Sequence, residues 1–365
     1  PVPQHADGNG GWTAGSSPFD SIQPWAGMVK STRTGGTMVA IPKFYFKLSK
    51  SGSVMKLQIV PAEFSAWALA NGYSVSPAHR DRGDGVGERD VVYIGRYHCS
   101  SSDWKSTTGV TPKVNVTRDA ARQGIHNLGS TIWQNDYATR ITLYMLYLVE
   151  FADWNSQAKI GGGCAPTGST SAVRNMGYTD TMTYHTGTDQ TSISATVYGG
   201  TQYRWIEGLW DNCYDWCDGV YFSGANIYAI LNPANFSDTT GGTLVGTRPT
   251  SSNYITAYDI SSASGFDWFF YPSAVASGDG STYVCDYCNY NASGVVLHVG
   301  GNYNQNQNHG LFYVNGNNAA SNSNANIGSR ILVNGSHSLL VITPTSGGVF
   351  AWVQIPHTSW WRLCR

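Results

Sequence analysis

Alternating apolar and polar positions dominate the first part of the chain and predict β-strands. The pattern begins at Gly36, runs to Lys47 and continues over Met55–Val60. A third run, Asp90–Tyr97, follows a stretch without a regular pattern. Successive side chains of a strand point to opposite faces, so a period of two is typical of strands that bury one face. We therefore expect strands at these three places.

Helical spacing appears only in the middle of the chain. Thr117 is a suitable N-cap for a short helix that ends near Gly124. A second helix is predicted from Thr131 to about Trp154. Its apolar positions recur at helical spacing and are interpreted as core packing, and they are Ile132, Ile141, Tyr144, Met145, Leu148, Val149 and Ala152.

Aromatic residues return at Arg204, and short strands and turns follow to about Val296. Three of these aromatic residues, Trp205, Trp210 and Trp216, are expected to be largely buried. No long helical pattern reappears after residue 155. Two helices among many short strands predict an α+β fold in which much of the chain is loop.

Composition narrows the classes of partner. The chain has 365 residues with 22 Lys+Arg against 23 Asp+Glu, and charged residues make up only 12%. No basic surface is therefore expected to hold nucleic acid by counterion release. Because no run of about 18 apolar residues occurs, we expect no membrane insertion. Aromatic residues reach 13%, and Tyr, Trp, Gly, Asn and Ser are abundant, as in proteins that bind through surface contact.

The candidate chemistry for catalysis or metal binding is sparse. The seven cysteines leave open buried free thiols, a local disulfide, or a four-thiolate zinc site from Cys213, Cys217, Cys285 and Cys288. No nucleophile-elbow, zinc-protease or phosphate-loop motif occurs, and the nine histidines lack metal-ligand spacing. The mixed-charge run His79–Asp90 is interpreted as a solvated loop, with a structural calcium loop as the alternative. We expect no catalytic residue, no metal ligand and no other cofactor.

The segment Leu297–Val333 is unusually rich in asparagine. Between Asn302 and Asn326, ten of 25 positions are Asn. Gly310–Val314 and Ile327–Val333 have strand character, so the Asn-rich residues should lie on loops between structured anchors. Asn suits tight turns, but that does not account for the Tyr, Gln and His interleaved with it.

Three segments carry a resemblance to known families. Arg204–Gly219 resembles the core segment of the formylglycine-generating-enzyme-like branch of the C-type lectin fold. Gly300–Tyr313, with Ser321-Asn322 and Asn326–Arg330, resembles the variable region of proteins diversified by diversity-generating retroelements. Gly36–Lys47 is similar to tail-associated proteins of phages and prophages. The resemblance covers about residues 31–333.

The resemblance implies a domain organisation. Residues 31–333 would form a C-type lectin-like domain with a variable ligand-binding region at 297–330. Residues 1–30 would be an irregular lead-in, and residues 334–365 a C-terminal extension of unknown structure. In that extension, 338–343 and 348–355 could each form a strand.

The resemblance also implies a set of ligand-binding residues. In such families, error-prone reverse transcription randomises adenines, so that Asn codons become a palette of Tyr, Ser, His, Asp and Gly. Gly300, Gly301, Gly310, Phe312, Gly316, Ser321, Asn326, Gly328 and Arg330 match scaffold positions. The ligand-binding positions are His298, Asn302, Tyr303, Asn304, Gln305, Gln307, Asn308, His309, Tyr313, Asn315, Asn317 and Asn318. We expect Tyr303, Gln305, Gln307, His309 and Tyr313 to be exposed and clustered, with Phe312 pointing inward.

The implied function is receptor binding rather than catalysis. The expected protein is a display protein of a phage or prophage tail, located at the tail tip or fibre of a virion. It would bind a bacterial surface protein or glycan, with a homo-oligomer such as a trimer as a possible assembly. A bacterial surface adhesin diversified by a cellular retroelement is the alternative. A formylglycine-generating-like oxidase using Cys285 and Cys288 is disfavoured, because the neighbouring Asp286 raises a thiol pKa.

Overall fold

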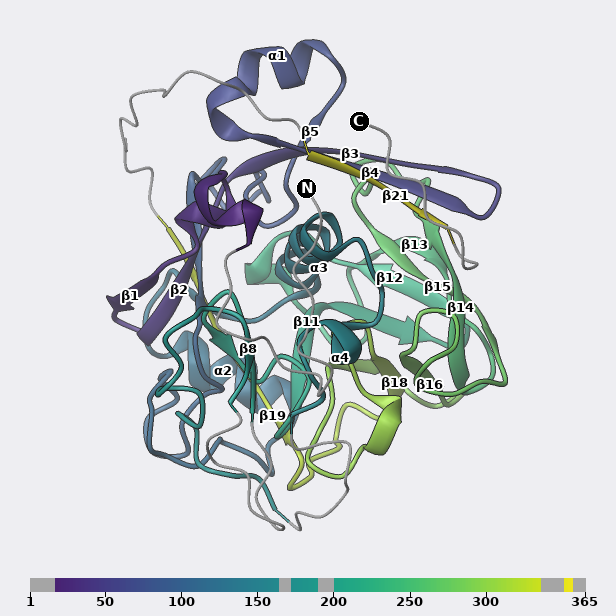
Figure 1. Cartoon of the computed structure of the whole chain (residues 1–365). Helices are drawn as coiled ribbons and strands as arrows, with labels where there is room; N and C mark the ends of the chain where they lie inside the picture. The colour runs from purple at the N-terminus through teal and green to yellow at the C-terminus, as the bar shows by residue number, and fades with distance from the viewer. Residues whose placement is uncertain (1–16, 164–171, 190–199, 336–350, 357–365) are drawn as a thin grey trace.

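A fully buried helix lies at the centre of the protein. The structure is a computed structural model that describes residues 17–163, 172–189, 200–335 and 351–356. Every residue of α3 (Tyr137–Phe151) is buried, and Figure 1 shows sheets above this helix and on both sides of it. Asp136 begins the helix by accepting a hydrogen bond from the backbone N–H of Thr139 at 2.8 Å. The helix is therefore buried on every face, and its two charged residues, Arg140 and Glu150, have hydrogen-bond or ion-pair partners inside the protein.

The two predicted helices are found, with one change. Thr117 caps α2 (Arg118–His126), as predicted, and the helix runs slightly past Gly124. The prediction that the second helix begins at Thr131 was wrong, because Ile132–Gln134 forms strand β7. This strand pairs with β20, and only then does Asp136 start α3.

A five-stranded sheet joins segments far apart in sequence. Its order is β1-β2-β6-β20-β7. We call residues 302–326 the Asn-rich tract, and the strand β20 that follows this tract lies between β6 and β7. The strands predicted at the start of the 36–47 run and at 90–97 are confirmed as β2 and β6. The bounds are β1 (Lys30–Arg33), β2 (Gly36–Pro42), β6 (Val91–Gly95), β20 (Ile331–Asn334) and β7 (Ile132–Gln134).

A four-stranded sheet of order β21-β4-β3-β5 covers one end of α3 (Figure 1). The remaining alternating runs form β3 (Phe44–Ser51) and β4 (Val54–Pro61), while β5 is Ser74–Val75. The C-terminal β21 (Ala351–Pro356) pairs with β4 and corresponds to the strand expected at 348–355. The strand expected at 338–343 lies outside the described residues.

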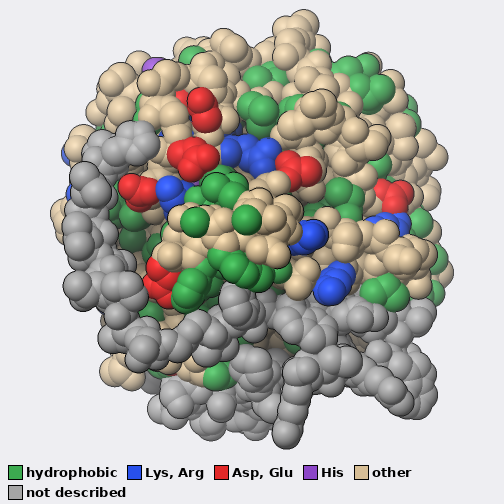
Figure 2. Space-filling view, turned by 90° about the horizontal axis from the view of Figure 1, so that it is seen from above, with side chains coloured by type: hydrophobic (Ala, Val, Ile, Leu, Met, Phe, Trp, Pro, Cys, Tyr) green, Lys and Arg blue, Asp and Glu red, His purple; other side chains and the backbone are tan. Residues whose placement is uncertain are grey.

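The short helix α1 (Ser65–Ala70) projects beyond this sheet and carries exposed apolar side chains. Trp67 is 44% exposed and Leu69 is 57% exposed. Figure 2 looks down on this end of the molecule and shows apolar side chains gathered there, with acidic and basic side chains around them.

The largest sheet has nine strands and nearly closes on itself. Its order is β13-β12-β11-β17-β18-β16-β14-β15, with β19 paired to β11. Gly246 on edge strand β13 lies directly against the Tyr271 ring on edge strand β15, which brings the two edges together. The bounds are β11 (Tyr214–Ser223), β12 (Asn226–Ala229), β13 (Thr243–Thr247), β14 (Asn253–Ile260), β15 (Phe270–Ala276), β16 (Tyr287–Tyr290), β17 (Val296–Val299), β18 (Val314–Asn318) and β19 (Ile327–Gly328).

The aromatic segment after Arg204 links the sheets. It contains β10 (Ile206–Glu207), which pairs with β9 (Thr201–Tyr203), and β9 pairs in turn with β8 (Gly187–Thr188). Trp210 and Trp216 are fully buried, as expected, whereas Trp205 is only partly buried. The fold is α+β and consists mostly of strands. The described residues contain four α-helices rather than the expected two, since α1 and the one-turn α4 (Ser156–Lys159) were not predicted.

The first described residues pack onto the core. Residues 17–30 contain two short 3-10 turns, and Phe19, Trp25 and Met28 are buried. The indole N–H of Trp25 donates to the carbonyl of Leu146 on α3 at 3.1 Å. The latter half of the expected lead-in is thus tied to the central helix.

The mixed-charge run His79–Asp90 is a loop, but only part of it is solvated as its composition suggests. His79, Arg82 and Arg89 are buried. Arg82 binds the N-capping carboxylate of Asp136 at 2.7 Å, and Arg89 binds Asp84. The prediction was therefore wrong for the buried arginines, because carboxylates and carbonyls partner their guanidinium groups, and a buried charge must be paired in this way.

Candidate ligand-binding face

The Asn-rich tract lies at one end of the nine-stranded sheet. Strand β17 runs antiparallel to β18, and the loop 300–313 connects them. Strand β16 is parallel to β18, so the segment 277–286 that leads into β16 emerges at the same end as this loop. The two connections meet, since a Cβ added to Gly280 would lie 3.0 Å from Cβ of Gln307.

The outer part of the loop presents a row of amide side chains. We call Asn304, Gln305, Asn306, Gln307 and Asn308 the amide rim. Asn304, Asn306 and Gln307 are exposed, while Gln305 and Asn308 are partly buried. The expected exposure of Gln307 is confirmed. Asn306, which matched no ligand-binding position, belongs to the same exposed row.

Half of the proposed ligand-binding residues lie inside the protein. Tyr313 is 0% exposed and Tyr303 is 8% exposed, so the prediction that they point to solvent was wrong, as it was for His309. Two further positions lie farther along β18, where Asn317 is exposed and Asn318 is partly buried. The buried positions are His298, Asn302, Tyr303, His309, Tyr313 and Asn315.

A turn explains the error at Tyr313. The prediction assumed a strand from Leu311 to Val314, in which alternate side chains face opposite ways. The backbone N–H of Tyr313 instead bonds to the carbonyl of Gly310 at 3.3 Å, and β18 begins only at Val314. Phe312 does point into the core, where its ring lies 4.8 Å from those of Tyr144 and Trp154. Tyr313 enters a second buried cluster, stacked 5.5 Å from Tyr214.

A chain of hydrogen bonds connects Tyr313 to the amide rim. The amide groups of Asn289 and Asn315 donate to the Tyr313 hydroxyl at 2.6 and 3.0 Å. With two donors already bound, that hydroxyl donates to the hydroxyl of Tyr214 at 3.2 Å, which in turn donates to the side-chain oxygen of Gln305. Burial raises the pKa of Tyr313 to about 12, so it stays protonated. The Tyr313 hydroxyl and the amide groups of Asn289 and Asn315 therefore have their hydrogen-bond partners inside the protein.

His298 lies beside this chain. Its ring stacks on Tyr214 at 4.4 Å, and its Nδ1 accepts a hydrogen bond from the amide of Asn318 at 3.0 Å. Its Nε2 has no hydrogen-bond partner among the described residues. Burial lowers the pKa of His298 to about 3, which keeps the ring neutral.

At two scaffold positions, Gly300 and Gly316, a larger residue would clash with its neighbours. Gly300 has a φ of +88°, and a Cβ there would run into the carbonyl of Leu209. A Cβ on Gly316 would lie 2.6 Å from the Phe222 ring and would also strike Arg248. The tract is therefore anchored where the backbone comes close to its neighbours.

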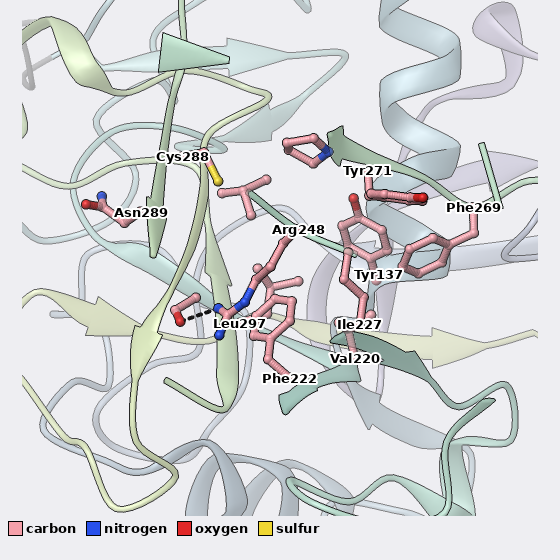
Figure 3. A pocket seen from close by; sticks show the side chains of 13 residues that line it. Tyr137, Val220, Phe222, Ile227, Arg248, Phe269, Tyr271, Cys288, Asn289 and Leu297 are labelled. Carbon is pink, nitrogen blue, oxygen red and sulfur yellow. Dashed lines mark hydrogen bonds between the residues drawn. The ribbon is translucent and has the colours of Figure 1, made fainter. Parts of the chain in front are cut away.

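Arg248 makes a hydrogen bond to the backbone of the tract, a role that was not predicted from the sequence. Its guanidinium donates to the carbonyls of Gly224, Gly316 and Gly294 at 3.0, 2.5 and 2.9 Å. Figure 3 shows the Gly316 bond beside a small pocket that is partly open to solvent. The pocket is lined chiefly by apolar side chains such as Tyr137 and Phe269. Burial lowers the pKa of Arg248 to about 10, so the group remains charged.

The cysteines near the face are buried free thiols. Cys99, Cys217, Cys285 and Cys288 carry no disulfide, so the free-thiol interpretation is confirmed for these four, and Cys213 is buried as well. Burial raises the pKa of both Cys285 and Cys288 to about 12, and a neutral thiol is a poor nucleophile and metal ligand. Cys164 and Cys364 lie outside the described residues. Within the described ranges, no group of three His, Cys, Asp or Glu side chains is placed to hold a metal ion.

Sequence comparison adds no relative to this picture. Among the described residues, no helix combines the length and apolar character needed to cross a membrane. No protein-family model and no curated protein matches the chain.

Proposed function

We propose that this protein is a receptor-binding display protein of a phage or prophage tail, with a C-type lectin-like fold diversified by a retroelement. It binds a target on the bacterial surface and catalyses no reaction. The amide rim, rather than the whole Asn-rich tract, makes the first contact with that target.

The observation that carries the proposal is the division of the tract into an outer and an inner part. Asn304, Asn306 and Gln307 are exposed on a loop whose two ends continue directly into paired strands. Surface side chains can be exchanged with little effect on stability, whereas buried ones cannot. A loop of this kind accepts new binding chemistry without loss of the fold.

The amide side chains of the rim are suited to binding a partner through hydrogen bonds. Amide side chains donate and accept hydrogen bonds, and such adaptable polar groups are typical of binding loops. The neutral, buried thiols of Cys285 and Cys288 favour binding over the oxidase alternative. The display protein and the surface adhesin share this face, so gene neighbourhood separates them: tail genes accompany the first, and an anchor or secretion signal accompanies the second.

The test uses fluorescently labelled full-length protein and a panel of intact bacteria. The wild type is expected to stain some strains, and the triple variant Asn304→Ala/Asn306→Ala/Gln307→Ala to stain them at least tenfold less. The matched control Trp67→Ser changes an exposed residue on α1, outside the tract, and should bind as the wild type does. Equal staining by the triple variant and the wild type, or no staining of any strain, would overturn the proposal.

A further inference from the structure

A second loop adjoins the amide rim and carries an exposed aromatic ring. Tyr283 is 47% exposed, the highest exposure of any described tyrosine. It belongs to the segment 277–286, whose Gly280 lies against Gln307. Three residues of chain span at most about 10 Å, so the Tyr283 backbone lies within that distance of the contact with the rim.

The backbone holds this tyrosine in an unfavourable conformation. Tyr283 has a φ of +56°, in the left-handed region that bulky residues avoid, and Cys285 has a φ of +69°. The next residue, Val284, is buried and donates its N–H to the carbonyl of Ile255 at 3.2 Å. The surrounding structure thus maintains a strained backbone that leaves the ring at the surface, and such strain clusters at ligand-binding sites.

One edge of the Tyr283 ring lies beside the backbone of Gly278. A Cβ on Gly278 would lie 3.2 Å from Cε2 of Tyr283 and would clash with Oγ1 of Thr282, so the loop backbone and the ring are in close contact here. Packing against the loop on one side limits the motion of the ring. A ring fixed in this way loses little conformational entropy when a ligand stacks on it.

The polar groups around the ring suit hydroxyl groups. One oxygen of Asp279 accepts hydrogen bonds from the backbone and hydroxyl of Ser281 at 2.9 and 2.7 Å. Its other oxygen, Oδ2, makes no hydrogen bond within the described part of the chain, and a carboxylate is a strong acceptor. The segments 277–286 and 302–309 contain no Lys or Arg. Asp279 is therefore the only charged side chain that these two segments expose, and on their own they favour a neutral ligand over an anion.

We propose that Tyr283 and Asp279, together with Gln307, form a binding site for a neutral sugar ring of a surface glycan. The apolar face of the sugar stacks on Tyr283, while its hydroxyls bind Asp279 and the rim amides. This inference rests on the proposed function and narrows the target from a protein or glycan to a glycan. It also extends the site to residues outside the Asn-rich tract.

The first test treats the stained bacteria before the labelled protein is added. Periodate, which cleaves vicinal diols of sugars, is expected to abolish staining, whereas protease treatment should leave it intact. Staining that survives periodate and is lost with protease would overturn the sugar assignment while leaving the display function standing. Loss of binding in the rim variant but not in Tyr283→Ala would instead overturn the role of the second loop.

The second test uses variants of the loop itself. Tyr283→Ala should weaken binding to the bacteria about tenfold, and Tyr283→Phe, which keeps the ring, should bind within about twofold of the wild type. Asp279→Asn keeps the shape and removes the charge, and it should weaken binding several-fold. Urea unfolding of each variant checks that the fold is intact. If Tyr283→Phe lost as much binding as Tyr283→Ala, ring stacking would be ruled out.

Discussion

The hydroxyl of Tyr313 lies 3.2 Å from that of Tyr214, beneath the surface of the Asn-rich tract. Tyr313 belongs to the tract, whereas Tyr214 opens the strand β11 that precedes it by about a hundred residues. The tract therefore supplies part of the protein interior as well as its outer loop. The two parts should therefore respond differently to substitution.

Tyr313→Phe should destabilise the fold although it removes only one oxygen. The amide groups of Asn289 and Asn315 would lose their acceptor in a buried site. An unsatisfied buried donor costs ~1–3 kcal/mol, to be measured as the free energy of unfolding in urea. The matched control Tyr283→Phe changes an exposed tyrosine and should stay within ~0.5 kcal/mol of the wild type. Equal stabilities for the two variants would contradict the hydrogen-bond chain.

Phe312→Ala tests the core beneath the tract. Its ring packs against Tyr144, Tyr147 and Trp154, and it is fully buried. Truncation should lower the free energy of unfolding by ~3–5 kcal/mol, because it leaves a cavity among these rings. Gln307→Ala on the rim should change it by no more than ~0.5 kcal/mol. A small effect of Phe312→Ala in thermal or urea unfolding would place this residue outside the core.

Stability should fall as the pH drops below neutral. Burial lowers the pKa of His298 to about 3 and that of His79, His98 and His309 to about 4. An unfolded histidine takes up a proton near pH 6.5, whereas these folded ones stay neutral. Their stabilising contribution is therefore complete above about pH 6.5 and is lost as the pH falls toward the folded values.

His298→Phe should weaken this pH dependence while preserving the stack on Tyr214. The comparison is the free energy of unfolding at pH 7.5 and pH 5 for the wild type and the variant. The loss between the two pH values should be smaller in the variant by on the order of 1–2 kcal/mol. An unchanged loss would show that His298 is not held neutral in the folded state.

Arg248→Met should loosen the strands behind the candidate face. The carbonyls of Gly224, Gly294 and Gly316 would lose their donor. Those of Gly294 and Gly316 lie in buried residues, and a buried acceptor without a partner is costly. Hydrogen exchange is expected to speed up around 291–295 and 314–318. Arg248→Lys keeps the charge but cannot donate to all three carbonyls, so it should show the same regional effect. Exchange that is unchanged in these segments would contradict the clamping role.

The alternating runs and the helix cap could be interpreted correctly because they are local signals. Strands β4 and β6 follow from a period of two, whereas β2 is a short apolar run in which Met38–Ile41 are all buried. Helix α2 follows from the hydrogen bond that Thr117 makes at its own helix end. The start of α3 could not be predicted, since Ile132–Gln134 is a strand only by pairing with β20, almost two hundred residues later.

The candidate face shows the same limit. The exposure of Gln307 follows from its polar loop, but the burial of Tyr313 depends on Tyr214 and Asn289, which come from other strands. The role of Arg248 could not be predicted either, because its partners are backbone carbonyls, which every residue has. An isolated arginine in a chain of low charge is the only signal that could have drawn attention to it.

The position of β20 has a consequence for any change within the preceding tract. Residues 331–334 complete the five-stranded sheet between β6 and β7, and Arg330 beside them bonds to the carbonyls of Gly95 and Glu207. A chain that stops early or shifts its reading frame anywhere in the tract lacks this strand, which leaves β7 without its partner in the sheet and one edge of β6 open. Only tracts that are translated in frame to their end can therefore complete this sheet.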